Sequence, residues 1–282
     1  MFCPLSLAAR IDRAEGRLCA AIAEAGSVAS AQHAPLSLPI AGGVAVYAGP
    51  DSPMNKLVGV GFDGPIVGPD LAPIEARFAT RTARLQAEVS TLADAELPAL
   101  LCARGYEPLG FENVLGHPLG AHLAPAPLGI SITLLTPHEH SAFADTLVTA
   151  VASPDLGGVG GDPVPPSDVV RRALLAMLRL PGFRGYIARI GGEIAGAASL
   201  RLDGDIAQLI GAGTLPRFRR RGVQSALLRA RLADVTGGGC QVAVVVTQPG
   251  SKSQENVQRE GFQLLYARQL LAKPAPGAAT PS

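Results

Sequence analysis

The sequence predicts an α/β (α+β) fold that occurs twice along the chain. Predicted strands and helices alternate over most of its 282 residues, and their order in the first half recurs in the second. Tight two-residue turns join several of the strands, as in antiparallel hairpins. At roughly 100–200 residues per domain, the length also fits two domains. Apolar residues make up 48% of the chain, which is ample for two buried cores.

Composition narrows the class of protein. The net charge of +1 gives no electrostatic reason to bind nucleic acid or an anionic membrane surface. Cys3, Cys19, Cys102 and Cys240 have no CxxC or zinc-ligand spacing, so we expect free thiols and no metal. The N-terminus lacks the basic residues of a signal peptide, and no stretch reaches the ~20 apolar residues of a membrane span. We expect a cytoplasmic protein, monomeric or homodimeric.

The first half begins with an amphipathic helix at 5–26, because Leu7, Ile11, Leu18 and Ile22 recur at helical spacing. A loop rich in Ser, Pro and Gly follows. Pro98 either kinks a later helix or marks its first turn. The remaining expected elements are strands at 43–47 and 56–62, a helix at 72–84, a strand at 86–90, a helix at 93–104 and a strand at 108–115.

Residues 116–128 contain Pro and Gly without any periodicity, which indicates a boundary between domains. We therefore predict one domain at 1–125 and a second at 129–273. Residues 274–282 are expected to form a disordered tail.

The second half is predicted to start with a strand at 130–135 and a helix at about 137–152, since Thr136-Pro137 is a good helix start. Gly191-Gly192 and Asp203-Gly204 suit hairpin turns that need positive φ angles. The expected order is then a Gly/Pro loop at 153–166, a helix at 167–179, strands at 186–190, 193–200 and 205–215, a helix at 222–236, a strand at 241–247, a helix at 252–259 and a strand at 263–271.

The two halves end in similar sequences. Ala103-Arg104-Gly105-Tyr106 aligns without a gap with Arg259-Glu260-Gly261-Phe262, and a strand follows each of them. A repeat of this length, with equal spacing of the elements, indicates two copies of one fold.

The segment most informative about function runs from an apolar strand ending at Leu215, through a basic loop, to a helix that starts at Gly222. The first turn of a helix leaves its N–H groups unpaired, and the helix dipole adds about half a positive charge. A phosphate group seated there satisfies both. Gly222 has no Cβ, so an anion can approach the backbone, and Arg219, Arg220 and Arg221 add charge.

This loop resembles that of the GNAT acetyltransferase superfamily, which reads R/Q-x-x-G-x-G/A between its fourth strand and third helix. Here the residues are Arg219-Arg220-Arg221-Gly222-Val223-Gln224, preceded by Pro216. Gln224 departs from the usual small residue, but this position meets the cofactor through its backbone, so a larger side chain that points away is tolerable. The resemblance covers about 129–273 and implies a mixed, mostly antiparallel sheet flanked by helices.

The resemblance also implies acetyl-CoA as co-substrate, with no metal. Backbone groups at Thr214 and Leu215 would pair with the pantetheine arm, where the fourth and fifth strands splay apart. The pyrophosphate would lie on the loop and helix start, against Arg219, Arg220, Arg221, Gly222, Val223, Gln224 and Ser225. Ser253 and Asn256 share a helix face and could contact the arm or the sulfur end of the cofactor, unless Ser251 or Ser253 only caps that helix.

The acid that protonates the departing thiolate is less clear. Many relatives place a Tyr four residues before the Gly of the Gly-Phe pair, but here that position is Val257. Tyr266, on the next strand, and Asn256 are weak candidates for a catalytic role. His138-Glu139-His140 is expected to be an exposed turn and not a metal site. Gly157–Gly161 imitates a nucleotide loop but has no strand before it.

The first half lacks this site. Its matching segment carries Pro65, Pro69 and Pro73, which have no N–H to offer, and Asp63 and Asp70, which repel phosphate. We therefore expect a degenerate copy without a cofactor site. The sequence favours an N-acetyltransferase acting on a small-molecule, amino-acid or peptide amine. The alternative is an acyl-CoA-binding regulatory module without turnover. A dinucleotide oxidoreductase is rejected, because Gly157–Gly161 has no acidic partner at the required distance.

Overall fold

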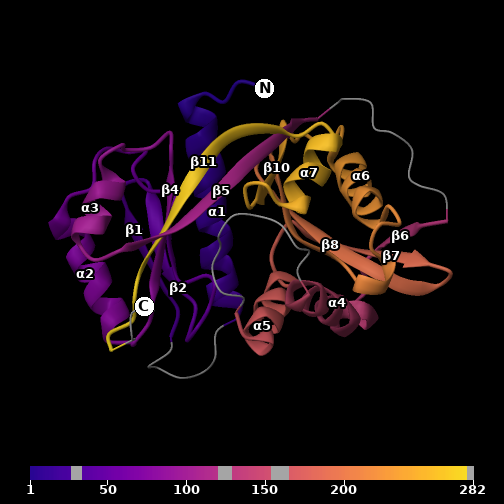
Figure 1. Cartoon of the computed structure of the whole chain (residues 1–282), viewed down its shortest axis with the longest axis horizontal. Coiled ribbons are helices and arrows are strands. Elements are labelled where there is room, and N and C mark those ends of the chain that lie inside the picture. The colour runs from indigo at the N-terminus through magenta and orange to yellow at the C-terminus, as the bar shows by residue number, and fades with distance from the viewer. Residues whose placement is uncertain (27–33, 120–128, 154–164, 278–282) are drawn as a thin grey trace. The chain divides into compact units, whose positions relative to one another are not determined.

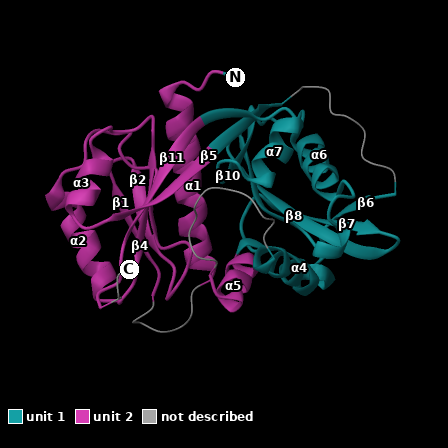
Figure 2. Cartoon of the chain, viewed as in Figure 1, with its two compact units in different colours: residues 1, 114–159, 177–265 teal, residues 2–113, 160–176, 266–282 magenta. Residues whose placement is uncertain are grey.

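The computed structural model describes residues 1–282 except 27–33, 120–128, 154–164 and 278–282 (Figure 1). The chain forms two compact units, and each unit draws on separate stretches of sequence (Figure 2). Unit 1 comprises residues 1, 114–159 and 177–265, and unit 2 comprises 2–113, 160–176 and 266–282. No helix in the described part of the chain is long and apolar enough to span a bilayer.

Unit 2 is a twisted sheet with helices on both faces. Its strand order is β1-β2-β3-β4-β11-β5, in which β3 and β4 run parallel and the pairs β1–β2, β2–β3 and β4–β11 run antiparallel. Its elements, apart from β5 and β11, are α1 (Leu5–Ala25), β1 (Leu36–Ile40), β2 (Gly43–Tyr47), β3 (Lys56–Val58), α2 (Gly68–Ala79), β4 (Leu85–Ser90), α3 (Leu97–Ala103) and most of α5 (Ser167–Met177).

The core of unit 2 explains the periodicity of its first helix. Cys19 and Ala23 of α1 pack on Val46 and Val58, so the apolar stripe of α1 covers one face of the sheet. The other face is covered by α2 and α3, whose buried residues join strand residues in a separate cluster that includes Leu57, Leu71, Phe78, Leu85, Leu97 and Leu101.

Unit 1 has the same kind of architecture. Its strand order continues β5-β10-β9-β8-β7-β6, with β9 and β10 parallel and the hairpins β7–β8 and β8–β9 antiparallel. Its elements are β6 (Ser131–Leu134), the 3₁₀ turn η2 (Pro137–Glu139), α4 (His140–Ala152), β7 (Phe183–Ile190), β8 (Glu193–Asp203), β9 (Ile206–Thr214), η3 (Pro216–Phe218), α6 (Val223–Val235), β10 (Val242–Thr247) and α7 (Lys252–Arg259). The expected mixed, mostly antiparallel fold is confirmed.

Two long strands, β5 (Glu107–Pro118) and β11 (Gln263–Lys273), contribute to both units. The distal part of β11 belongs to unit 2, where Arg268–Lys273 pairs with β4 in antiparallel register. The distal part of β5, from Val114 on, belongs to unit 1. The units therefore differ from the predicted division at 125–129, because each half lends the end of its last strand to the unit built mainly by the other half.

The repeat predicted from the two Gly-aromatic pairs has a structural counterpart. Gly105 and Gly261 both have positive φ, +85° and +94°. The N–H of Tyr106 donates to the carbonyl of Leu101 at 3.1 Å, and the N–H of Phe262 donates to that of Val257 at 3.1 Å. Helices α3 and α7 thus end in the same kind of turn, which only glycine adopts without steric cost.

Several elements differ from the sequence expectations. β1 lies within the segment expected to be a loop rich in Ser, Pro and Gly. Its Pro39 is tolerated because β1 is the edge strand of its sheet. β3 ends at Val58 because Gly59 and Gly61 adopt positive φ. The helix expected at 72–84 is α2, which begins at Gly68. Pro98 lies in the first turn of α3 and does not kink it.

Candidate functional site

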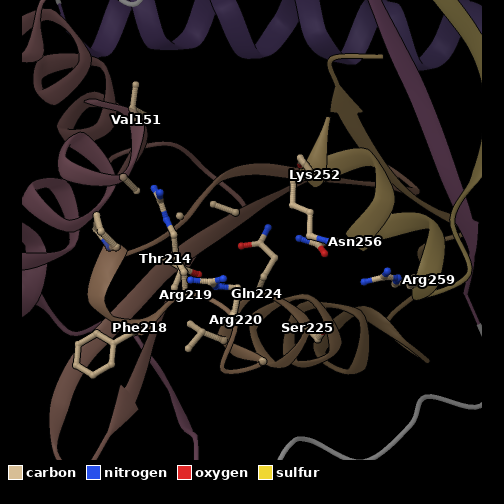
Figure 3. A pocket seen from close by; sticks show the side chains of 17 residues that line it. Val151, Thr214, Phe218, Arg219, Arg220, Gln224, Ser225, Lys252, Asn256 and Arg259 are labelled. Atoms are coloured by element: carbon tan, nitrogen blue, oxygen red, sulfur yellow. The ribbon is translucent and has the colours of Figure 1, made fainter. Parts of the chain in front are cut away.

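A cavity of about 950 Å³ lies in unit 1 at the start of α6 (Figure 3). This volume is in the upper part of the range of about 300–1,000 Å³ found for ligand sites. The cavity is bounded by the end of β9, the loop before α6, the first turn of α6 and one face of α7. Its lining residues are Ala150, Val151, Ala212, Gly213, Thr214, Pro216, Phe218, Arg219, Arg220, Gly222, Val223, Gln224, Ser225, Lys252, Ser253, Asn256 and Arg259.

The loop before α6 has the backbone shape of an anion-binding nest. Arg220 and Gly222 both adopt left-handed φ angles, +59° and +82°, with Arg221 between them. Such alternation turns successive N–H groups toward one point. The first helical bond of α6 runs from the Ala226 N–H to the Gly222 carbonyl at 3.0 Å. The N–H groups of the preceding first turn therefore have no acceptor within the helix.

Two of the three loop arginines line the cavity. Arg219 and Arg220 do so, and the Arg219 guanidinium also donates to the Ser153 carbonyl at the end of α4. Arg221 instead lies over the Phe218 ring, 5.5 Å from its centroid, and is not among the lining residues. The Arg219–Ser153 contact fixes the loop beside α4.

The strands next to the loop diverge. β9 and β10 pair only over Ile206–Gln208 and Val242–Val244, so β9 runs on toward Thr214 without β10 beside it. On its other side β9 stays paired with β8, with a bulge at Gly211, whose φ is +49°. One edge of β9 is thus available for an extended ligand. The buried Thr214 Oγ1 has no hydrogen-bond partner among the described residues.

The opposite wall of the cavity is one face of α7. Lys252, Asn256 and Arg259 line it at the i, i+4 and i+7 spacing of a single helix face, and Ser253, three residues before Asn256, lines it as well. The helix is capped by Ser251, whose hydroxyl accepts from the Gln254 N–H at 3.2 Å. Of the two serines considered, Ser251 therefore caps α7, and Ser253 lines the cavity.

A paired salt bridge ties α7 to α6. The Arg229 guanidinium meets the Glu260 carboxylate in two hydrogen bonds, of 2.7 and 2.9 Å. The Glu260 side chain is 9% exposed, so water screens this pair weakly. The pair therefore links the two helices whose residues form opposite walls of the cavity.

The comparisons with known proteins agree with this geometry. Residues 158–262 match the model of the acetyltransferase (GNAT) family. The chain contains a GNAT acetyltransferase domain. This domain includes the loop, α6, β10 and α7, so the predicted resemblance is confirmed for this part of the chain, and the match supports an acyltransferase. No curated protein matches the sequence.

Solved structures show the same fold over most of the chain. A GCN5-related N-acetyltransferase from Kribbella flavida is 17% identical, with 96% of each chain covered and a TM-score of 0.68. A tandem GNAT protein from the clavulanic acid biosynthesis pathway is 16% identical, covers 92% of this chain and 89% of its own, and has a TM-score of 0.56. A GCN5-related N-acetyltransferase from Sphaerobacter thermophilus is 15% identical over 76% of this chain and 71% of its own, at 0.56.

The GNAT domain holds most of the residues predicted for the cofactor in one place. Thr214, Arg219, Arg220, Gly222, Val223, Gln224, Ser225, Ser253 and Asn256 all line the cavity. Leu215 and Arg221 do not, and the Leu215 N–H donates to the Ala195 carbonyl at 2.9 Å. Sequence reasoning missed Lys252 and Arg259, although their i+7 spacing on the helix that carries Asn256 could have revealed them.

The Gln224 side chain does not point away from the cavity, so the arrangement that would tolerate a larger residue there is not the one adopted. Its side chain lines the cavity and faces Asn256 of α7 (Figure 3). The reason is geometric, because a side chain in the first turn of a helix leans toward the N-terminal end, where the loop lies. The GNAT site of this chain therefore carries a carboxamide where the family has a small residue.

Tyr266 lies outside the GNAT cavity. It belongs to unit 2, is 4% exposed, and donates its hydroxyl hydrogen to Asp12 Oδ1 at 2.5 Å. Burial raises the pKa of this phenol well above its ordinary value. A hydroxyl that is buried, bonded to a carboxylate and weakly acidic does not protonate a departing thiolate. Val257, at the position of the family's Tyr, packs in the core of unit 1.

His138-Glu139-His140 forms the predicted turn. The Glu139 carboxylate accepts from the Thr136 N–H at 2.9 Å and from its hydroxyl at 2.7 Å, a capping arrangement. These hydrogen bonds hold the Glu139 pKa at about 2. Among the described residues, no group of His, Cys, Asp or Glu is placed to hold a metal ion. Gly157–Gly161 lies outside the described residues.

The corresponding helix start in unit 2 carries a proline and a carboxylate. Pro69 takes the first turn of α2, and the Asp70 carboxylate accepts from the Val67 N–H at 3.1 Å. β3 and β4 also pair over only three residues, but the Asp94 N–H donates to the Gly61 carbonyl at 3.1 Å just beyond. The carboxylate at the helix start opposes phosphate binding by charge repulsion, and the backbone hydrogen bond engages the Gly61 carbonyl just beyond β3.

Proposed function

We propose that this protein is an acetyl-CoA-dependent N-acetyltransferase. It would move an acetyl group to the amine of a small molecule, amino acid or peptide by direct attack in a ternary complex. The observation that carries the proposal is the cavity at the start of α6, where unpaired N–H groups, Arg219 and Arg220 converge beside the free edge of β9.

The residues present fit acetyl-CoA. The first-turn N–H groups from Val223 to Ser225 and the nest at Arg220–Gly222 would hold the pyrophosphate. The edge of β9 up to Thr214 would hydrogen-bond the pantetheine amides as a neighbouring strand does. When bound, acetyl-CoA supplies the activated acyl group. The chain contributes the positioning of that group and the exclusion of water around it.

The reaction also needs proton transfer, including a proton for the departing thiolate. Val257 has no proton to donate, and Asn256 offers only carboxamide N–H groups, which can hydrogen-bond the sulfur end of the cofactor without protonating it. Positioned acids and bases typically contribute about 10²–10⁴-fold in rate. We infer that the thiolate leaves with the help of hydrogen bonds alone, which favours a slow enzyme.

The same observation supports a second function. A chain that binds acyl-CoA in this cavity but has Val257 in place of an acid would serve as a regulatory module without turnover. The test is incubation of the full chain with acetyl-CoA and a panel of amines, with release of free thiol as the readout. Amine-dependent thiol release supports the transferase. Binding of acetyl-CoA without release for any amine supports the regulatory module, and no binding rejects both.

A further inference from the structure

Unit 2 contains a cavity of about 340 Å³ that shares no lining residue with the GNAT cavity. Its volume falls within the range found for small-molecule sites. It lies between the C-terminal end of α1, the loop after β2 and one face of α5, all of which belong to unit 2 (Figure 2). Its lining residues are Ile22, Ala23, Gly26, Pro35, Ala48, Gly49, Pro50, Asp51, Ser52, Pro166, Asp168, Val169, Arg172, Ala173 and Ala176.

The inner lining of this cavity is apolar. Ile22 and Ala23 of α1 and Val169 and Ala176 of α5 are each at most 7% exposed. A Cβ built on Gly26 would lie 3.5 Å from the Ala176 Cβ, so the end of α1 and α5 approach each other closely. Apolar groups placed against such a lining leave water, which is favourable. The cavity therefore suits a ligand with an apolar body.

The loop after β2 is held in place by a buried side chain. Asn55, 6% exposed, accepts from the Ala48 N–H and donates to the Gly49 carbonyl, both at 2.8 Å. Asp51, in the same loop, has a left-handed φ of +53°, which aspartate and asparagine adopt more readily than most residues. The fold thus presents the Asp51 side chain at the cavity without first having to order the loop.

The charged groups of the lining favour a cation. They comprise two carboxylates, Asp51 and Asp168, and one guanidinium, Arg172. Asp168 pairs with Arg172 at 3.3 Å across one turn of α5, whereas Asp51 has no hydrogen-bond donor or cation paired with its carboxylate among the residues that the structure describes. The last turn of α1 has no basic residue, so the helix dipole adds negative partial charge at that wall.

We propose that this cavity binds a small ammonium ion with an apolar body, which gives unit 2 a ligand of its own. The ammonium group donates a charge-assisted hydrogen bond to the Asp51 carboxylate. The apolar body lies against Ile22, Ala23 and Ala173. The inference does not rest on the proposed function, because the bound form is the charged ammonium and not the neutral amine that attacks a thioester.

The test is calorimetric titration of the full chain, near neutral pH, with three probes of similar shape: N,N-dimethylphenethylamine, phenethyl alcohol and phenylpropionate. A tertiary amine forms no stable amide, so its binding is measured apart from acyl transfer. The amine should bind at least about tenfold more tightly than the alcohol, as expected for a hydrogen bond to a charged group. The carboxylate should bind most weakly, because Asp51 repels it.

Two variants separate the charge from the cavity. Asp51→Asn should lower the affinity for the amine to that for the alcohol, because asparagine keeps the left-handed φ and loses the charge. Ala173→Leu fills part of the cavity and should weaken the amine and the alcohol together. Asp63→Asn is the matched control, because Asp63 pairs with Arg13 in unit 2 and does not line the cavity. It should leave all three affinities unchanged.

Three results would overturn the inference. They are tighter binding of the carboxylate than of the amine, an amine affinity that either Asp51→Asn or Ala173→Leu leaves unchanged, and no binding of the amine. Each of them leaves the proposed function standing, since acetyl-CoA is absent from these titrations and its proposed site in unit 1 has other lining residues.

Discussion

The hydroxyl of Tyr266 and the carboxylate of Asp12 are joined by a hydrogen bond of 2.5 Å, although the residues are 254 positions apart. Arg268 reaches the same carboxylate oxygen, at 2.6 Å, and all three side chains are almost fully buried in unit 2. The end of the last strand therefore builds the interior of unit 2. A buried network of this kind is costly to break, because each lost partner leaves a buried polar group unpaired.

Tyr266→Phe is expected to lower stability and leave catalysis intact. Loss of the hydroxyl takes one donor from the buried Asp12, at a cost of about 1–3 kcal/mol. Thermal unfolding and steady-state kinetics measure the two effects. Tyr186→Phe removes a similar bond to Asp234, a more exposed carboxylate, and should cost less. A large fall in kcat with unchanged stability in Tyr266→Phe would show that this hydroxyl acts in the reaction.

Glu112 is expected to make the stability of the protein depend on pH. Burial, and next the charge of Glu88, raise the Glu112 pKa to about 7. Because the folded state holds this proton and the unfolded state releases it near 4.5, Glu112 destabilises the fold progressively as the pH rises from about 4.5 to 7. Glu112→Gln removes that dependence but can still accept from Arg268 Nη1, which lies 2.9 Å from Glu112 Oε1.

The free energy of unfolding of Glu112→Gln, minus that of the wild type, should therefore grow across this range and level off above it. A rise of roughly 3 kcal/mol corresponds to the shift in the Glu112 pKa. Denaturant unfolding at several pH values measures it. A difference that does not change with pH contradicts the assignment.

The sequence located the phosphate loop because the signals there are local. Gly222, the basic residues before it and the apolar spacing of α6 all act within one turn of a helix. The environment of Tyr266 could not be predicted in this way. Alternation shows which residues of β11 share a face, but it does not say that the strand pairs with β4, 180 residues earlier. The Gln224 side chain lines the cavity because side chains in the first turn of a helix lean toward its N-terminal end.

Two substitutions of Arg220 should distinguish the contribution of its charge to binding from the strain of its backbone. A non-glycine residue at φ +59° costs about 1–2 kcal/mol. Arg220→Gly and Arg220→Ala both remove the guanidinium, so both should weaken acetyl-CoA binding equally. The Gly variant should be about 1 kcal/mol more stable than the Ala variant, because only Gly adopts this φ freely. Equal stability of the two variants in denaturant unfolding would show that the loop relaxes in solution.

The chain should bind one acetyl-CoA and not two. At the start of α2, which corresponds to the start of α6, Pro69 has no N–H to donate and the Asp70 carboxylate repels phosphate. Equilibrium dialysis with excess acetyl-CoA should give one mole of ligand per mole of chain. Two moles would mean that unit 2 has kept a cofactor site of its own.

The most direct test of the account is calorimetric titration of acetyl-CoA into the wild type, Gly222→Ala and Gly239→Ala. Both glycines have positive φ, +82° and +89°, so the two substitutions strain the backbone alike. Only Gly222 lines the cavity, whereas a Cβ at Gly239 meets open space. We predict that Gly222→Ala weakens binding at least about tenfold, as for lost charge-assisted hydrogen bonds, and that Gly239→Ala binds as the wild type does. Unchanged affinity in Gly222→Ala, or no binding by the wild type, would contradict the proposed site.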